Sequence, residues 1–309
     1  SNGTRSPTKK GIRGGAYALG LMYYNALKDY PNAIKWFEIA HKEGHKGAAY
    51  ALALLYNKTL ADYPKAIKWY EIAHKEGDKS AAYSFGLMYY NALKDYPNAI
   101  KWYEIAHKEG DKSAAYALGL LYEDQLKDYP KAIEWYNIAH NKGYQGAAYA
   151  LAILYNERLK SYPNAIEWYN IAHNEGDKRA ILALGLLYGQ SLKDYPKAIQ
   201  CLETAFYKVG DNSASYELGF LYESKLNDYP NAIRWYKQFD RKYAFEWLKE
   251  DADKDFRAAQ YMVGLMYMDG RAPKDITKAR EYLKKAADNG IEEAKEALAA
   301  LNNAQPKRE

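Results

Sequence analysis

Five histidines are the residues whose type and spacing most suggest chemistry, because imidazole is a common zinc ligand and a frequent acid-base group. They recur every 33 residues, at His41, His74, His107, His140 and His173. Ligands of one zinc ion must lie about 2 Å from it, whereas stacked helices lie ~10 Å apart. We therefore expect these to be packed or rim histidines, one in each hairpin, that share no metal.

Other catalytic patterns are incomplete. His41 and His45 have the spacing of a zinc-protease helix, but Gly44 is expected to end the helix between them. Residues 6–9 have Ser-x-x-Lys spacing without the Lys-Thr-Gly or Ser-Asp-Asn companion of a β-lactamase. Cys201 is the single cysteine, so it forms no intramolecular disulfide, and it stands where other copies carry Trp, which favours a buried thiol. The sequence predicts no enzyme activity, metal or cofactor.

A repeated segment must position all of these residues. Its most regular mark is a Tyr-Pro pair, 33 residues apart in six copies and 34 before the seventh. The pairs begin at Tyr30, Tyr63, Tyr96, Tyr129, Tyr162, Tyr195 and Tyr229. A period of this length predicts a stack of helical hairpins.

The first helix of each hairpin shows one apolar face. In the fourth copy this face consists of Ala114, Leu118, Gly119, Tyr122 and Leu126, which follow an α-helical period and are predicted to point into the hairpin. Gly119 costs about 1 kcal/mol of helix propensity relative to Ala, so we expect it to permit close helix contact.

The second helix has clear start and stop signals. Asp128 is a typical N-cap, Pro130 suits the first turn, and Gly143 suits the left-handed residue that closes a helix. The residues predicted to face inward are Ala132, Trp135, Tyr136 and Ala139.

These patterns together resemble the Sel1-like repeat. The shared features are Ala-x-x-x-Leu-Gly-x-x-Tyr, a following Asp, Ala-x-x-Trp-Tyr-x-x-Ala and a closing Gly, and the fit is closest over residues 259–298. The resemblance implies an all-α, right-handed superhelix of about eight hairpins over residues 14–303, with a capping helix near 291–302. It also implies a protein-binding scaffold or adaptor, often in bacteria. The paired cysteines of the cysteine-rich branch are missing.

The remaining segments depart from the period. Residues 1–13 are predicted to be a flexible basic tail and residues 304–309 a polar tail. The seventh copy is irregular over residues 228–255, because a second helix start at Ala244 follows the one at Ala232 after 12 residues. Twelve residues rotate a helix about a third of a turn out of register, so we expect a lengthened helix or a break.

Net charge and hydropathy limit the classes of partner that the chain could bind. The net charge of +5 comes from residues 1–13 (+4) and the last residues (+1), which leaves residues 14–303 neutral. A neutral body lacks the basic stripe that nucleic acids require. No apolar run is long enough to span a membrane, and no signal-peptide pattern opens the chain, although Ser1-Asn2-Gly3 is typical of a tag remnant. We expect a monomer that binds another protein or peptide.

The predicted binding residues lie on the face of the first helices that points away from the hairpin core. A tyrosine series repeats there at Tyr17, Tyr50, Tyr83, Tyr116, Tyr149, Tyr216 and Tyr261. A polar slot changes from copy to copy: Asn25, Lys58, Asn91, Asp124, Glu157, Gln190, Ser224 and Asp269. Such residues would line a concave groove, although the tyrosines could equally pack between hairpins. Alternative functions are an immunity-type protein that neutralises a toxin and a hydrolase of the cysteine-rich Sel1-like type.

Overall fold

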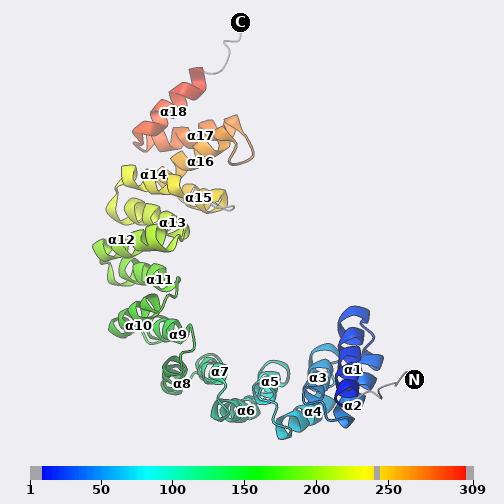
Figure 1. Ribbon diagram of the computed structural model, residues 1–309. Coiled ribbons are helices and arrows are strands. Elements are labelled where there is room, and N and C mark those ends of the chain that lie inside the picture. The colour runs from blue at the N-terminus through cyan, green and yellow to red at the C-terminus, as the bar shows by residue number, and fades with distance from the viewer. Residues whose placement is uncertain (1–8, 240–243, 304–309) are drawn as a thin grey trace, which may run out of the picture. The chain divides into compact units, whose positions relative to one another are not determined.

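The computed structural model describes residues 9–239 and 244–303, and every regular element in these ranges is helical (Figure 1). This confirms the all-α prediction. The chain forms two compact units, Ser1–Leu154 and Tyr155–Glu309, each built from helical hairpins. Most of the two predicted tails, residues 1–8 and 304–309, lies outside the described residues.

The first unit is a row of hairpins in which each helix packs against the next one along the chain. Its helices are α1 (Lys9–Met22), α2 (Tyr30–Lys42), α3 (Ala48–Leu54), α4 (Tyr63–Lys75), α5 (Ala81–Met88), α6 (Tyr96–Lys108), α7 (Lys112–Leu121), α8 (Tyr129–Asn141) and α9 (Ala147–Ile153). Helix α1 begins before the predicted start at Gly14. Within this unit the odd-numbered helices lie along one side and the even-numbered helices along the other (Figure 1).

The second unit continues the same pattern and then departs from it. Its helices are α10 (Tyr162–Asn174), α11 (Ala180–Leu186), α12 (Tyr195–Thr204), α13 (Ser213–Leu221), α14 (Tyr229–Gln238), α15 (Ala244–Asp253), α16 (Arg257–Asp269), α17 (Ile276–Asp288) and α18 (Glu292–Asn303). The final helix, α18, is the predicted terminal helix, and it buries Ala294 and Leu301.

The predicted helix boundaries are confirmed by their cap geometry. The Asp128 side chain accepts a hydrogen bond from the backbone N–H of Lys131, and Pro130 lies in the first turn of α8. Gly143, after the end of α8, has φ of 71°, the left-handed conformation that only glycine adopts without a steric cost. Corresponding aspartates cap α2, α4, α6, α12 and α14, whereas α10 begins after Ser161, which makes no such bond.

Close packing inside each hairpin depends on Gly119 and Tyr136 in the fourth copy. A Cβ atom added at Gly119 would lie 2.4 Å from the Tyr136 ring, so the prediction that this glycine permits close contact is confirmed. Ala132, Tyr136 and Ala139 are fully buried as predicted. Trp135 is only half-buried, because it packs on the preceding hairpin: its ring lies 5.3 Å from that of His107.

The histidines lie at the seam between hairpins, where one second helix meets the next. His41 contacts Trp69 edge to face at 5.1 Å, and His41 Nδ1 lies 3.4 Å from Glu76 Oε1. His74 repeats both contacts, with Trp102 and Glu109. These histidines are packed side chains, as predicted, and the residues that they pack against belong to the following hairpin.

Each first helix from α1 to α13 ends in a π-helical turn, which the sequence did not indicate. These turns are η1 (Tyr23–Leu27), η2 (Leu55–Thr59), η3 (Tyr89–Leu93), η4 (Tyr122–Leu126), η5 (Leu154–Arg158), η6 (Leu187–Leu192) and η8 (Tyr222–Leu226). A π turn holds more residues than an α turn, so the predicted helical wheel fails there. Leu126, predicted to point inward, is instead 43% exposed.

The irregular seventh copy contains the break that was one of the two expectations. Helix α14 ends at Gln238, Phe239 is extended, and α15 begins at Ala244. Helix α15 packs against α16, and α14 also contacts α16. The seventh copy therefore carries an additional helix beside α13 and α14.

Candidate partner-binding surface

The tyrosine series of the first helices takes part in packing between hairpins. Tyr50 tilts against Tyr70 of its own hairpin, and its hydroxyl shares a hydrogen bond of 2.8 Å with Ser84 Oγ of the next hairpin. Tyr116 stacks on Tyr144, in the loop to the next hairpin, at 4.6 Å. The half-buried members are Tyr17, Tyr50, Tyr83, Tyr116, Tyr149 and Tyr216, whereas Tyr261 is buried. Each half-buried ring thus has one packed and one accessible part.

The polar slot lies in the π turns, except for Asp269, which is the last residue of α16. Asn25, Lys58, Asn91, Glu157 and Gln190 are exposed, and Asp124 is half-buried. A row of exposed leucines follows close behind them. This leucine row consists of Leu27, Leu60, Leu126, Leu159, Leu192 and Leu226, between 38% and 56% exposed. The π turns therefore present an apolar and a changing polar side chain together in most copies.

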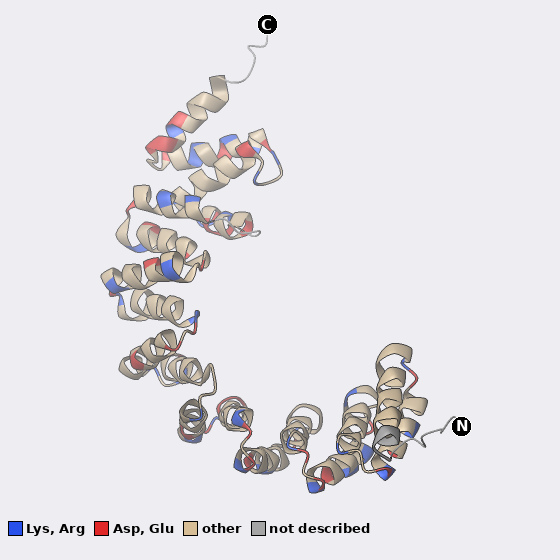
Figure 2. Ribbon diagram, viewed as in Figure 1, with Lys and Arg blue, Asp and Glu red and all other residues tan. Residues whose placement is uncertain are grey.

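The first helices carry little charge. Helices α3, α5, α9 and α11 contain no charged residue, and the blue and red segments of Figure 2 gather mainly on second helices and loops. Helix α13 differs, because it contains Glu217. The first six copies have Ala or Ser at this position, and the eighth has Met262.

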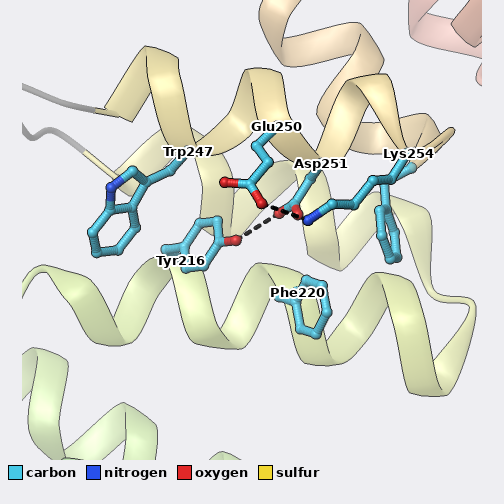
Figure 3. A pocket seen from close by; sticks show the side chains of 7 residues that line it. Tyr216, Phe220, Trp247, Glu250, Asp251 and Lys254 are labelled. Carbon is cyan, nitrogen blue, oxygen red and sulfur yellow. Dashed lines mark hydrogen bonds and ion pairs between the residues drawn. The ribbon is translucent and has the colours of Figure 1, made fainter.

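A cavity of about 390 Å³ lies beside α13 in the second unit (Figure 3). Its aromatic lining comes from Tyr216, Phe220, Trp247 and Phe256. Its charged lining comes from Glu250, Asp251 and Lys254 of the additional helix α15 and its C-terminal end. The Tyr216 hydroxyl donates a hydrogen bond of 2.6 Å to Asp251 Oδ2. Tyr216 therefore belongs to the tyrosine series and to this cavity.

Several carboxyl groups near this cavity are poorly solvated. Burial, together with the charge of Asp251, raises the pKa of Glu217 to about 7. Burial also raises the pKa of Asp251, against the opposing effect of the Tyr216 hydrogen bond. Glu223, whose pKa burial raises to about 6, accepts a hydrogen bond of 2.6 Å from the backbone N–H of Ala258. This part of the second unit therefore concentrates carboxyl groups whose charged forms are disfavoured by burial.

Sequence reasoning missed Glu217, Phe220, Trp247 and Asp251 as a group. The signal in the sequence is the pair Glu217 and Phe220, which replaces a small residue and an aliphatic residue of the first six copies.

Cys201 lines a second cavity, of about 300 Å³, together with His173. Other copies place a tryptophan at the Cys201 position, under the histidine of the preceding hairpin. Burial raises the pKa of the Cys201 thiol to about 11. A thiol that stays protonated is a poor nucleophile, so the predicted structural role fits this position.

Within residues 9–239 and 244–303, no three His, Cys, Asp or Glu side chains come together in a way that could hold a metal ion. No helix in these ranges has the length and apolar character needed to cross a membrane.

Comparison of the sequence with models of known protein families identifies the family of this chain. The model of the Sel1 repeat matches residues 14–45, 47–78, 80–111, 112–144, 146–177, 178–209, 207–239 and 257–291. The chain belongs to the Sel1 repeat family. Sel1 and related tetratricopeptide-like repeats are typically non-catalytic scaffolds for protein-protein interaction.

The chain is similar to several solved structures. A Sel1 repeat protein from Oxalobacter formigenes is 26% identical with a TM-score of 0.59, covering 94% of this chain and 88% of that one. The protective antigen c5321 of uropathogenic Escherichia coli is 20% identical with a TM-score of 0.36, covering 97% and 82%. The immunity protein Pa5087 from Pseudomonas aeruginosa is 22% identical with a TM-score of 0.34, covering 63% and 76%. The search of curated proteins found no relative of this Sel1 repeat chain.

Proposed function

We propose that this chain is a non-catalytic scaffold that binds a partner protein or peptide on the face that the first helices form within a unit. The observation that carries the proposal is the repeated combination on that face of half-buried tyrosines, exposed leucines and a polar slot that changes between copies. The tyrosine edges and the leucine row supply contact area, and the polar slot supplies register and selectivity.

The sparse charge of the first helices supports the same surface. Protein-binding surfaces are depleted of charge at their centre and enriched in aromatic residues, and helices α3, α5 and α9 fit this description. The second helices instead carry lysines, such as Lys68 and Lys101, that are exposed to solvent. The two sides of a hairpin therefore differ in the way that a binding side and a solvated side differ.

The test of this proposal must leave the fold intact. It therefore changes exposed residues of the polar slot and not the packed tyrosines. A photo-reactive amino acid is placed at Lys58 or Asn91 in the slot, and at Lys68 or Lys101 on the second helices; all four residues are exposed. After illumination in an extract of the source cells, mass spectrometry identifies the crosslinked protein. We expect crosslinks from the two slot positions and none from the second helices.

A charge reversal then measures the contribution of the slot. The purified partner is titrated against Lys58→Glu and against the matched control Lys68→Glu, which makes the same charge change on the opposite side. We expect the slot variant to weaken binding by about tenfold, since interface residues that matter cost more than 1 kcal/mol, and the control to leave it unchanged. Crosslinks confined to the second helices, or equal weakening by both variants, would refute the proposal.

A further inference from the structure

The seventh hairpin departs from the other copies at adjoining positions on its first helix. Glu217 stands where the first six copies have Ala18, Ala51, Ser84, Ala117, Ala150 and Ala183 and the eighth has Met262. Phe220 stands where the others have Leu21, Leu54, Leu87, Leu120, Ile153 and Leu186. The additional helix α15 follows the same copy and brings Trp247 and Asp251 to α13. Repeat packing alone explains none of these departures, because the other copies pack without them.

The aromatic residues form the walls of the cavity described above. The Tyr216 ring lies 5.3 Å from Trp247, nearly at right angles, and Phe220 lies 5.3 Å from Phe256. Trp247 is 41% exposed, which is unusual for a large aromatic side chain. The volume of about 390 Å³ falls within the roughly 300–1,000 Å³ typical of ligand pockets.

The base of the cavity is a carboxylate that forms no ion pair with any residue the structure describes. Asp251 is 5% exposed, and its Oδ2 accepts the hydrogen bond from Tyr216. Its other oxygen, Oδ1, accepts no hydrogen bond from any described residue. Lys254 is nearby, but its Nζ donates to Glu250 Oε1 at 2.7 Å (Figure 3). A buried carboxylate with a free oxygen is costly unless a positive group pairs with it.

We propose that this cavity binds the positively charged side chain of an arginine or a lysine in the partner polypeptide. Faces of Trp, Tyr and Phe attract organic cations, and the Asp251 carboxylate accepts a charge-assisted hydrogen bond from them. Anionic side chains gain neither interaction, and neutral side chains gain neither the attraction to the ring faces nor the ion pair with Asp251. The inference rests on the proposed scaffold function, and it assigns to the seventh hairpin the role of anchoring one basic residue.

The test needs no identified partner. The probes are the blocked tripeptides Gly-Arg-Gly and Gly-Lys-Gly, with Gly-Gln-Gly as the uncharged control. The full chain carries ¹⁵N-labelled tryptophan, and the Trp247 indole signal is assigned by its loss in Trp247→Phe. We expect saturable shifts of this signal with the arginine or the lysine peptide and none with the glutamine peptide.

Substitutions of residues that line the cavity then test whether the peptides bind there. Asp251→Asn keeps an oxygen for the Tyr216 hydroxyl and removes the charge, and we expect it to weaken binding about tenfold. Phe220→Leu introduces the residue that most other copies carry, and we expect a weakening of about threefold. Lys254→Gln removes a competing cation, and we expect binding to become about twofold tighter. Glu246→Gln, which removes an exposed charge of the same helix outside the lining, should leave binding unchanged.

Two results would overturn the assignment: equal shifts with the glutamine peptide, or an unchanged titration in Asp251→Asn while thermal unfolding shows an intact fold. The two proposals fail separately. If the peptides cause no shift of the Trp247 signal but Lys58→Glu weakens partner binding, the cation site in the cavity is refuted and the scaffold surface is supported. If peptide binding depends on Asp251 but Lys58→Glu binds the partner as tightly as the parent chain, the cation site is supported and the role of the polar slot is refuted.

Discussion

The hairpins of the first unit and the seventh hairpin of the second unit place polar groups at their contacts in different ways. In the first unit, His41 faces Glu76 and Tyr50 faces Ser84, so a partner is available on the next hairpin. In the seventh hairpin, Glu217 and Asp251 have raised pKa values, and no described lysine or arginine forms an ion pair with either. The regular copies are explained by their packing, whereas the departing copy holds charge that packing does not require.

The largest expected effect comes from breaking the core of a regular hairpin. Tyr70 is fully buried, so Tyr70→Ala should lower the free energy of unfolding by about 3–5 kcal/mol, as for other large-to-small core changes. Tyr70→Phe is the matched control, because Phe37 occupies the same position in the first copy and only the hydrogen bond from Asn57 is lost. Urea unfolding measures both, and equal losses would contradict this account of the core.

The second prediction concerns pH and the seventh hairpin. An unfolded glutamate loses its proton near pH 4.3, whereas the raised pKa of Glu217 keeps the folded form protonated up to about pH 7. Stability is therefore fully present below the unfolded pKa and is lost as the pH rises toward 7, by about 2–3 kcal/mol. Urea unfolding of the second unit at pH 5 and at pH 7.5 measures the loss.

The matched variant for this pH effect is Glu217→Gln, which should flatten the profile between pH 5 and 7.5. The residual slope should come from Glu223 and Asp251, whose pKa values are also raised. A profile in Glu217→Gln as steep as in the parent chain would show that Glu217 does not carry the effect.

The third prediction concerns a substitution that would restore the histidine–tryptophan contact between hairpins in the second unit. Cys201→Trp should occupy part of the cavity of about 300 Å³ beside His173 and raise the free energy of unfolding by about 1–2 kcal/mol. Thermal unfolding measures the gain, with Cys201→Ala as the control that adds no aromatic ring. A lower melting temperature for Cys201→Trp would show that the neighbouring side chains have closed the space.

The smallest expected effect concerns the one seam of the first unit that lacks the acid. His107 stands over Trp135 like its counterparts, but Lys142 replaces the glutamate, and burial together with Lys142 and Lys108 lowers the pKa of His107. Lys142→Glu should raise that pKa and add about 0.5 kcal/mol of stability below pH 6, lost as the pH rises through the new pKa. NMR titration of His107 in this variant and in Lys142→Gln separates the gained acid from the lost lysine.

Local signals in the sequence account for the parts of the fold that were foreseen. Asp128, Pro130 and Gly143 place the start and end of α8 because each acts on backbone groups within a few residues of itself. The candidate surface was foreseen only in outline. The tyrosine series and the polar slot were found by period, but the wheel that placed them assumed α-helical geometry, and the π turns changed the position of Leu126.

The amino-acid sequence by itself determined the period, the hairpin, the helix caps and the glycine at the helix crossing, since all of these depend on contacts within one repeat. Only the tertiary structure decided that Tyr136 fills the core while Trp135 faces the seam, because adjacent side chains on one helix are separated by about 100° and compete for the same interior. Likewise, Tyr216 meets Asp251 only because α15 packs against α16 and returns to α13, an arrangement that no short-range signal specifies.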